Sequence, residues 1–400
     1  MKFLFVAPRF HTNQFMVTKS LIDKGHEVSF FVYYRGKTED YSYVVPYVMK
    51  KSFLTKWLGK VMEKQYGPVK AEGINRKYFI PHFFNLFQKV KEVHPDIVIV
   101  RDTTLTALYI NLFCKVLGIK YVVLYNQIPL YSKKTSSIKK KIKIIIKKLC
   151  FPRVRITTVC MENPTKYIHQ KDQYYIKKHD YFVPFVEEAR DADRPYCQNG
   201  IVSILGVGKY RDTKNHFLLV NALMQLKDKG GFRAMIVGQA YNQDEIDYYD
   251  RLNRYIREKG LDDVITLKKN VDYAEMKGLY AQYDVFALTT KREFASIAVL
   301  EAMANGMVTI STDNNGTASY IEEGKCGFLF KTMDVEDLVS KIDIVLSNKE
   351  RIKSMGKAAC ENIRENYSCN NYYEALGEVL KKEFNLDLSK QSIGVKDGLG

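Results

Sequence analysis

The sequence predicts an α/β protein with two doubly wound parallel sheets, each in its own domain. Short apolar runs with strand character alternate with longer helical segments along the 400-residue chain, and strands separated by helices pair in parallel. A charged stretch over 187–196 breaks this alternation near the middle. Because 400 residues are enough for two domains of ordinary size, we expect domains over 1–192 and 193–369.

The elements of the first domain follow from apolar periodicity and from helix start and stop signals. Thr12 is expected to cap the first helix, and Gly25 to end it. The expected strands lie at 2–7, 27–33, 96–100, 120–125, 156–161 and 181–185. The expected helices lie at 12–24, 47–64, 75–93 and 104–117.

The second domain repeats the alternation. Its expected strands lie at 201–206, 232–237, 264–267, 284–290 and 308–311. Its expected helices lie at 215–226, 243–258, 273–282, 335–346 and 349–365, and a last helix follows at 370–384. The final stretch, 391–400, has the composition of a disordered tail.

Charge and cysteine content narrow the function classes. The formal net charge of +17 indicates affinity for an anionic partner. The seven cysteines are scattered without CxxC spacing, which is typical of buried thiols in a reducing compartment and not of zinc ligands or disulfides. The first apolar run is too short for a signal peptide, and no run reaches the roughly 20 apolar residues of a membrane-spanning helix. We therefore expect a cytoplasmic protein.

Two basic amphipathic stretches, 45–64 and 133–155, suggest where an anionic partner could bind. The first carries the chain's only tryptophan, Trp57, on its apolar face, and the second has ten Lys or Arg and no acidic residue. Such helices suit an anionic membrane surface, so we expect peripheral association with the inner face of a membrane. For the stretch 133–155 the alternative is an ordinary helix whose isoleucines pack on the sheet while the lysines are solvated.

The stretch 293–306, EFASIAVLEAMANG, concentrates the chemistry of the chain. Glu293 closes a loop between a strand and a buried helix that Ser296 begins and Gly306 ends. Glu301 is the one carboxylate on that helix. Because helical side chains lean toward the N-terminus of the helix, Glu301 points back toward the loop that carries Glu293. The free N–H groups of the first turn lie at the same end and favour anions. The two carboxylates can accept hydrogen bonds from hydroxyl groups, and the free N–H groups can donate hydrogen bonds to a phosphate. Together they favour a nucleotide-sugar as the ligand.

This stretch resembles the retaining family 4 glycosyltransferases of the GT-B fold, within the glycosyl transferases group 1. Their Glu-x7-Glu motif and the following Ala-Met-Ala-x-Gly match Glu293, Glu301, Ala302, Met303, Ala304 and Gly306. The resemblance implies two Rossmann-like domains facing across a cleft, with the helix 370–384 packing back on the first. It also implies metal-independent transfer with retention of configuration and without a protein nucleophile. No cofactor or metal is expected.

The resemblance also implies roles for individual residues on the donor side. Glu301 would bind the ribose, Glu293 would hold the donor sugar, and Lys209 and Lys214 would stabilise the leaving diphosphate, a duty that Arg211 could share. Gly206, Gly208 and Gly238 would allow close approach of the nucleotide. The family's Gly-Phe-Gly-like run after the first Glu is replaced here, so donor contacts there are expected to differ; the residues concerned are Phe294, Ala295, Ser296 and Ile297.

The acceptor-side candidates lie after strands of the first domain, where ligands of doubly wound sheets bind. They are His11, Thr12, Asn13 and Asn126. Asn126 stands near the point where the resembling family often has a His, so a His-dependent role does not carry over.

These observations predict a retaining glycosyltransferase that moves a sugar, of hexosyl type, from a nucleotide-diphospho-sugar to a glycan or lipid-linked acceptor in cell-surface polysaccharide synthesis. One alternative is a nucleotide-sugar epimerase of the same fold. A second, from a different class, is a non-catalytic basic RNA-binding protein. No RNA-recognition motif appears, and the basic residues concentrate in amphipathic helices, so no nucleic-acid partner is expected.

Overall fold

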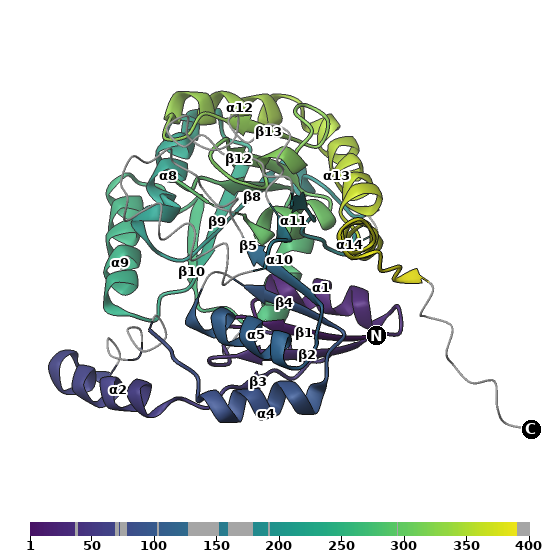
Figure 1. Ribbon diagram of the computed structural model, residues 1–400. Helices are drawn as coiled ribbons and strands as arrows, with labels where there is room; N and C mark the ends of the chain where they lie inside the picture. Colours follow the sequence, from purple (N-terminus) through teal and green to yellow (C-terminus); the bar gives the residue numbers. More distant parts are fainter. Residues whose placement is uncertain are drawn as a thin grey trace, which may run out of the picture. The chain divides into compact units, whose positions relative to one another are not determined.

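The computed structural model describes residues 1–36, 39–68, 72, 78–101, 104–126, 152–158, 179–190, 193–293 and 295–389 (Figure 1). These residues form two compact units. The first contains the described residues up to 158, residues 179–183 and the chain from 372 onward, and the second contains the described residues of 184–371. Each unit is built on one parallel sheet, as the alternation of strands and helices predicts.

The sheet of the first unit has the strand order β3-β2-β1-β4-β5-β6-β7, with all described neighbours paired in parallel. In register, Val6 of β1 lies between Phe31 of β2 and Val100 of β4. The inner strands β1 and β4 are almost fully buried, as expected when helices cover both faces of a sheet. The strands are β1 (Lys2–Val6), β2 (Glu27–Val32), β3 (Tyr47–Val48), β4 (Ile97–Arg101), β5 (Tyr121–Asn126), β6 (Arg155–Thr157) and β7 (Asp180–Phe182).

Two helices of the first unit begin later than the sequence predicts. Tyr47–Val48 pair with β2 as the edge strand β3, so the helix expected from residue 47 begins only at Phe53. Ser52 caps that helix, because its hydroxyl accepts a hydrogen bond from the Thr55 N–H at 3.2 Å. The helix expected from residue 75 begins at Phe83. The helices are α1 (Thr12–Ile22), α2 (Phe53–Tyr66), α4 (Phe83–Val93) and α5 (Leu105–Val116).

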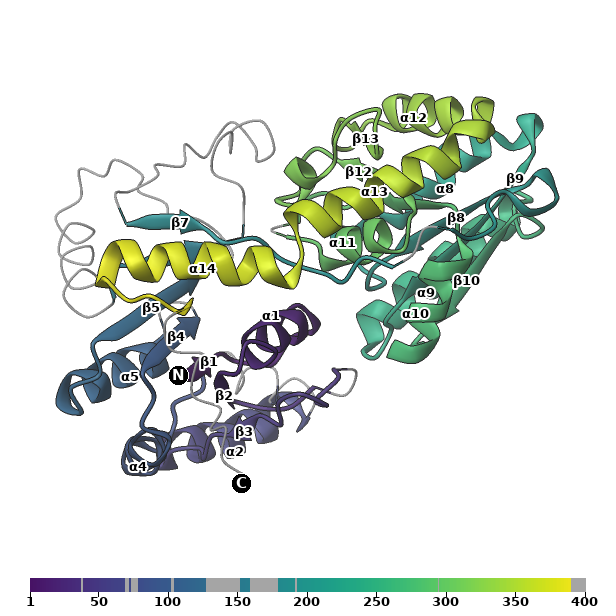
Figure 2. The ribbon, with the colours of Figure 1, turned by 90° about the vertical axis from the view of Figure 1, so that its right-hand side faces the viewer.

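The helix near the end of the chain, α14 (Cys369–Phe384), packs on the first sheet (Figure 2). The ring of Phe384 meets Tyr121 of β5 edge-on, with 5.4 Å between the ring centroids. Glu383 lies 2.9 Å from Nδ1 of His179 and accepts a hydrogen bond from the Tyr181 hydroxyl. The tail expected over 391–400 lies outside the described residues.

The second unit has a sheet of order β10-β9-β8-β11-β12-β13, again parallel throughout. The strand order reverses between β8 and β11, so the loops that follow these two strands meet at the switch point where ligands bind in such sheets. Gly327–Phe330, where no strand was predicted, forms the edge strand β13. The other strands are β8 (Val202–Val207), β9 (Phe232–Gly238), β10 (Ile265–Lys269), β11 (Val285–Leu288) and β12 (Val308–Thr312).

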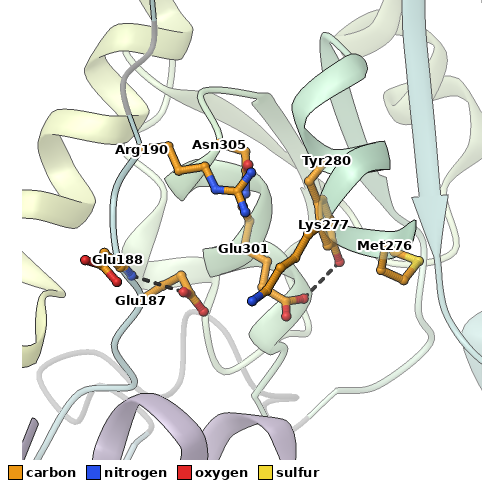
Figure 3. Close-up of a pocket in the computed structure, with 8 residues that line it drawn as sticks. All are labelled: Glu187, Glu188, Arg190, Met276, Lys277, Tyr280, Glu301 and Asn305. Atoms are coloured by element: carbon orange, nitrogen blue, oxygen red, sulfur yellow. Dashed lines mark hydrogen bonds between the residues drawn. The ribbon is translucent and has the colours of Figure 1, made fainter. Parts of the chain in front are cut away.

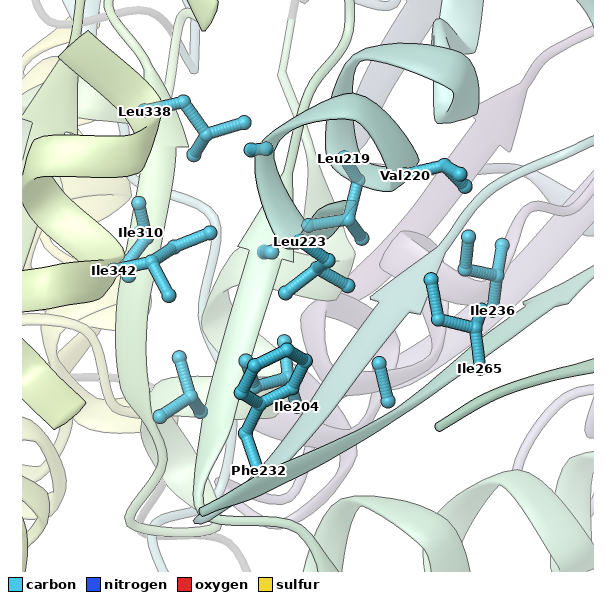
Figure 4. Packing of buried hydrophobic residues seen from close by; sticks show 14 of the residues in the cluster. Ile204, Leu219, Val220, Leu223, Phe232, Ile236, Ile265, Ile310, Leu338 and Ile342 are labelled. Atoms are coloured by element: carbon cyan, nitrogen blue, oxygen red, sulfur yellow. The ribbon is translucent and has the colours of Figure 1, made fainter. Parts of the chain in front are cut away.

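Helices cover this sheet and close its core. Leu219 and Leu223 of α8 pack onto Ile204 and Ile236 of the sheet, while Leu338 of α12 belongs to the same buried cluster (Figure 4). Burying each such side chain contributes about 1.5–3 kcal/mol. The helices are α8 (His216–Gln225), α9 (Gln243–Glu258), α10 (Tyr273–Gln282), α11 (Ile297–Ala304), α12 (Val335–Ser347) and α13 (Ile352–Asn366). No described helix in either unit has the length and apolarity needed to cross a membrane.

Candidate active site

Glu293 is fixed in the loop after β11 by backbone hydrogen bonds. Its N–H donates to the carbonyl of Asn314 at 3.1 Å, and its carbonyl accepts from the N–H of Gly316 at 3.1 Å. The side-chain amide of Asn314 also donates to the carbonyl of Lys291 at 2.8 Å. The loop is therefore held against the chain after β12, although the glycines usual in the resembling family are missing.

Lys214 comes from the loop after β8 and forms an ion pair with Glu293. Both side chains keep about a fifth to a quarter of their surface exposed, 24% for Lys214 and 21% for Glu293. The two loops are also joined through hydroxyls: Thr289 donates to the carbonyl of Lys214 at 3.2 Å, and Thr290 donates to that of Thr213 at 2.8 Å. The structure thus brings together two predicted catalytic residues that lie 79 positions apart.

The loop that carries Lys209 is supported by His216, a residue to which the sequence assigned no role. Nε2 of His216 lies 3.1 Å from the carbonyl oxygen of Gly208 and 3.3 Å from that of Lys209. Burial lowers the pKa of His216 to about 4, so its ring is neutral and bears a proton on Nε2 to donate. Gly208 leaves room beside it, because a Cβ there would lie 3.1 Å from Cδ of Lys214.

Arg211 is paired with a carboxylate of the chain itself. Its Nε and Nη2 donate to Oε1 of Glu245 at 2.8 and 2.6 Å, and Oε2 of Glu245 accepts from the Tyr241 N–H at 3.0 Å. Burial raises the pKa of Glu245, but these bonds and the nearby charges of Arg211 and Lys209 outweigh burial and hold it below its usual value. Arg211 is therefore held by Glu245 in the ligand-free chain, and its share in binding the diphosphate stays a prediction.

The glycines of the switch point serve the packing of the chain itself. A Cβ on Gly238 would lie 2.1 Å from the carbonyl oxygen of Gly208 and 3.1 Å from the Tyr210 ring. A Cβ on Gly206 would lie 3.0 Å from Cδ2 of Leu219 in the core. The atom that approaches Gly238 closely therefore belongs to the loop after β8. This contact alone accounts for a glycine at position 238, and no nucleotide is needed to explain it.

The start of α11 is held differently from the prediction. Ser296 occupies the N-cap position, but its side chain makes no capping hydrogen bond. Its N–H instead donates to Oγ1 of Thr317 at 3.3 Å. Gly306 has the positive φ of 71° expected after the helix. Ala295 and Ile297 flank Ser296 in the same loop and first turn, whereas Phe294 lies outside the described residues.

Glu301 lies in a pocket between α10, α11 and the segment 187–190 (Figure 3). Its Oε2 accepts a hydrogen bond from the hydroxyl of Tyr280 at 3.0 Å. Burial raises the pKa of Glu301, and the Tyr280 bond and the Lys277 charge act in the opposite direction. The described residues that line the pocket are Glu187, Glu188, Arg190, Met276, Lys277, Tyr280, Glu301 and Asn305.

Sequence reasoning missed most of this pocket. Lys277 and Tyr280 are three residues apart on α10 and so share one helix face, but nothing local in the sequence directs that face toward Glu301. Glu187 was read as part of a charged linker. Glu293 and Glu301 have different partners, Lys214 for the first and Tyr280 for the second.

The acceptor-side candidates occupy the first unit. His11, and not Thr12, is the N-cap of α1; its side chain makes no capping bond, and its Nδ1 lies 3.1 Å from Nη2 of Arg9. Thr12 and Asn13 lie in the first turn, where the Asn13 side chain is buried. Asn126 is the last residue of β5, but its side chain lies outside the described part, as do residues 133–151 of the second basic stretch. Among the described residues, no group of three or more His, Cys, Asp or Glu could hold a metal ion.

Residues 200–362 match the model of the Glycosyl transferases group 1 family. They form a glycosyl transferases group 1 domain. This group 1 domain contains Lys209, Lys214, Glu293 and Glu301, and its match confirms the predicted assignment to the glycosyl transferases group 1 over residues 200–362.

Individual relatives agree with this assignment over parts of the chain. The sulfoquinovosyl transferase SQD2 of Arabidopsis thaliana is 39% identical over 90 residues, which are 22% of this chain and 18% of that protein. The putative colanic acid biosynthesis glycosyltransferase WcaL of Salmonella typhimurium is 25% identical over 175 residues, 42% of each chain. The chain thus spans less than half the length of these curated relatives.

The fold extends beyond the group 1 domain. The structure of HepE from Anabaena, solved in complex with UDP, superposes with a TM-score of 0.66 and 14% identity over 96% of this chain and all of that one. At this identity the likeness concerns the fold alone. It confirms the predicted GT-B architecture of two parallel-sheet units.

Proposed function

We propose that this protein is a retaining, metal-independent glycosyltransferase that moves a hexosyl group from a nucleotide-diphospho-sugar to a glycan or lipid-linked acceptor in cell-surface polysaccharide synthesis. The observation that carries the proposal is the pairing of Lys214 with Glu293 at the switch point of the second sheet. A cation for phosphate and a carboxylate for sugar hydroxyls are held there by two loops of a group 1 domain. The UDP complex of HepE and the polysaccharide-related name of WcaL are consistent with this donor and acceptor class.

In this proposal the donor lies along the carboxyl edge of the second sheet. Glu301 accepts hydrogen bonds from the ribose hydroxyls, and the diphosphate lies toward Lys214 and Lys209. Glu293 receives the hydroxyls of the sugar. Before the donor binds, Lys214 is held by Glu293, so the diphosphate competes for a cation that is already in place.

The chemistry required of these residues is mainly electrostatic. The acceptor hydroxyl attacks the anomeric carbon on the face from which the diphosphate leaves, the bond from that carbon to the phosphate oxygen breaks, and the departing phosphate takes the acceptor's proton. Negative charge grows on the diphosphate during this step. Preorganised cations such as Lys214 stabilise that charge without reorganising, which lowers the barrier.

Nucleotide binding tests the donor half of the proposal. Nucleoside diphosphates and nucleotide-sugars with uracil or guanine bases are expected to raise the unfolding temperature, because a ligand at about 100 times its Kd stabilises by about 2.7 kcal/mol. Glu301→Gln should weaken the best ligand by about 1.5–3 kcal/mol, roughly 10- to 150-fold in Kd. It should also reduce the preference for the ribonucleotide over its 2′-deoxy analogue. If no nucleotide shifts the unfolding of the wild type, the donor assignment is wrong.

The acceptor side of the proposal includes an anionic membrane surface on the cytoplasmic side. Helix α2 presents apolar side chains to solvent, with Phe53 exposed by 82% and Trp57 by 52%. Lys56 and Lys60 lie on the same helix. The first basic stretch thus has an apolar face that no described residue covers and cations beside it, as interfacial helices do.

Vesicle binding tests this contact. The protein is expected to bind vesicles of phosphatidylserine with phosphatidylcholine at low salt and to leave them at high salt, because surface potentials are screened. Replacing Phe53 and Trp57 together by Ser should weaken binding more than tenfold, since each buried aromatic side chain contributes about 1.5–3 kcal/mol. Leu112→Ser on α5 is the control, because Leu112 is also exposed, by 46%. Equal retention of all three proteins would contradict the contact through α2.

A further inference from the structure

Glu187 is held in a defined position at the pocket that contains Glu301. Its N–H donates to the carbonyl of Tyr367 at 2.9 Å, and the N–H of Glu188 donates to its Oε1 at 3.1 Å. Three residues on, the Arg190 N–H donates to the carbonyl of Ala304 at 2.8 Å. The segment is therefore pinned to the end of α13 and to α11, and its side chains have a fixed relation to the pocket.

The segment is anchored a second time before Glu187. The Phe185 N–H donates to the hydroxyl of Tyr320 at 3.1 Å, and the ring of Tyr320 stacks on that of Tyr367 with 4.0 Å between centroids. Tyr367 supplies the carbonyl that binds Glu187. Glu187 thus belongs to the same rigid support as the helix bearing Glu301, and it is not part of a loose linker.

The pocket contains two carboxyl groups close enough to interact, together with cations. Burial raises the pKa of Glu187 to about 7, and the Glu301 carboxylate adds to this effect. Lys277 of α10 opposes the increase, as does the Glu188 N–H, but they do not cancel it. Tyr280 of α10 and Arg190 of the same segment also line the pocket (Figure 3).

A ligand that enters this pocket changes the balance between the two carboxyl groups. It displaces water and so strengthens the repulsion between two neighbouring negative charges, which favours a state with one proton between them. A protonated carboxyl is a donor, whereas an ionised one only accepts. A ribose beside a base offers both kinds of partner, because its hydroxyls donate and its ring oxygen and the base carbonyls accept.

We propose that Glu187 is a second carboxyl group of the donor pocket, which enters the complex uncharged and donates a hydrogen bond to a ligand oxygen while Glu301 accepts from the ribose hydroxyls. This inference rests on the proposed function, since it assigns the pocket to the ribonucleoside part of a nucleotide-sugar. When Glu187 is ionised in the free protein, the proton is taken from solvent as the ligand binds. Donor affinity therefore depends on pH.

The direction of the dependence follows from the protonation states. Below pH 7 Glu187 already carries its proton, so affinity does not change with pH. Above pH 7 each binding event must also protonate Glu187, so Kd rises by up to tenfold for each pH unit. Affinity at pH 8 should be about tenfold weaker than at pH 6.

The experiment measures the Kd of UDP-glucose and of GDP-mannose calorimetrically from pH 6 to pH 8.5. Intact nucleotide-sugars are the right probes, because the terminal phosphate of a nucleoside diphosphate itself titrates near pH 6. Glu187→Gln imitates the uncharged acid and keeps an oxygen for the Glu188 N–H, so it should bind at pH 8 as tightly as the wild type binds at pH 6. Glu258→Gln, an exposed position at the end of α9, should retain the wild-type profile.

The outcomes separate this inference from the proposed function. If the wild-type Kd is flat from pH 6 to 8 while Glu301→Gln still weakens binding, the role of Glu187 is overturned and the proposed function is not. This outcome does not depend on whether Glu187→Gln folds. A pH dependence that persists in Glu187→Gln assigns the proton to another group and also overturns the role of Glu187. Failure of both nucleotide-sugars to bind at every pH, with no thermal shift from any nucleotide, overturns the proposed function instead.

Discussion

Replacing Glu293 by alanine is expected to lower kcat by about 100- to 1,000-fold while the Kd of the nucleoside diphosphate changes only a few-fold. A group that positions the reacting sugar acts mainly in the transition state, and loss of one preorganised polar contact or a 1 Å misplacement costs a rate factor of this size. In the proposed complex the diphosphate is bound by Lys214 and Lys209, so nucleotide binding should survive. Initial rates with donor and acceptor, together with nucleotide titrations, give the two quantities.

Glu275→Ala is a matched control for Glu293→Ala. Glu275 of α10 also pairs with a lysine, Lys268 of β10, but this pair is exposed, with 41% of the Glu275 side chain and 45% of the Lys268 side chain accessible. Exposed pairs contribute about 0–1 kcal/mol, so this variant should keep wild-type turnover and stability. Unchanged turnover in a folded Glu293→Ala protein would remove Glu293 from the catalytic role.

The fold was predictable from the sequence because it depends on periodicity. Apolar runs such as 97–100 and 285–288 are buried, and the helices between the strands force parallel pairing. The errors lie at the edges of the sheets. Tyr47–Val48 and Gly327–Phe330 are short strands that each pair on one side only, with β2 and with β12, so local propensity alone could not separate the first from a helix.

The candidate site was predictable only in part. Lys214 and Glu293 could be found through the resemblance to the family, and the topology of a doubly wound sheet explains why the loops that carry them meet. Glu187 could not, because its place beside Glu301 depends on backbone bonds to Tyr367, 180 residues later in the chain. Packing between side chains of segments that are remote in the sequence leaves no periodic pattern in the sequence from which it could be predicted.

Two residues have partners within the chain that could not be predicted, for a related reason. Gly238 looked suited to a nucleotide, but the atom that approaches it is the carbonyl oxygen of Gly208. Arg211 looked suited to phosphate, but Glu245, 34 positions away, binds it through two hydrogen bonds. In both cases the residue type correctly indicated a close contact or an anion, and the partner turned out to be part of the chain itself.

Replacing Lys214 by methionine is expected to lower kcat by about 100- to 1,000-fold and also to weaken nucleoside diphosphate binding. The lysine is the predicted cation that the loops hold in an ion pair at the switch point, and charge on the diphosphate grows in the transition state, so the loss should be larger in kcat than in affinity. This differs from Glu293→Ala, for which affinity is expected to be almost unchanged. Comparing kcat with nucleotide Kd in both variants therefore distinguishes the cation from the sugar-binding carboxylate.

The double variant tests whether the two residues act as a unit. If Lys214 stabilises the transition-state charge fully only while Glu293 orients it, the effects of the two substitutions on the activation free energy should fall short of additivity by about 0.5–3 kcal/mol. Lys291→Met is the control, because Lys291 pairs with Asp212 in the same two loops, yet Asp212 is 81% exposed and the pair contributes little. Strict additivity would mean that Lys214 and Glu293 act independently. Wild-type kcat in Lys214→Met would mean that the pair only holds the loops together, and the diphosphate would then need another cation, for which Lys209 is a candidate.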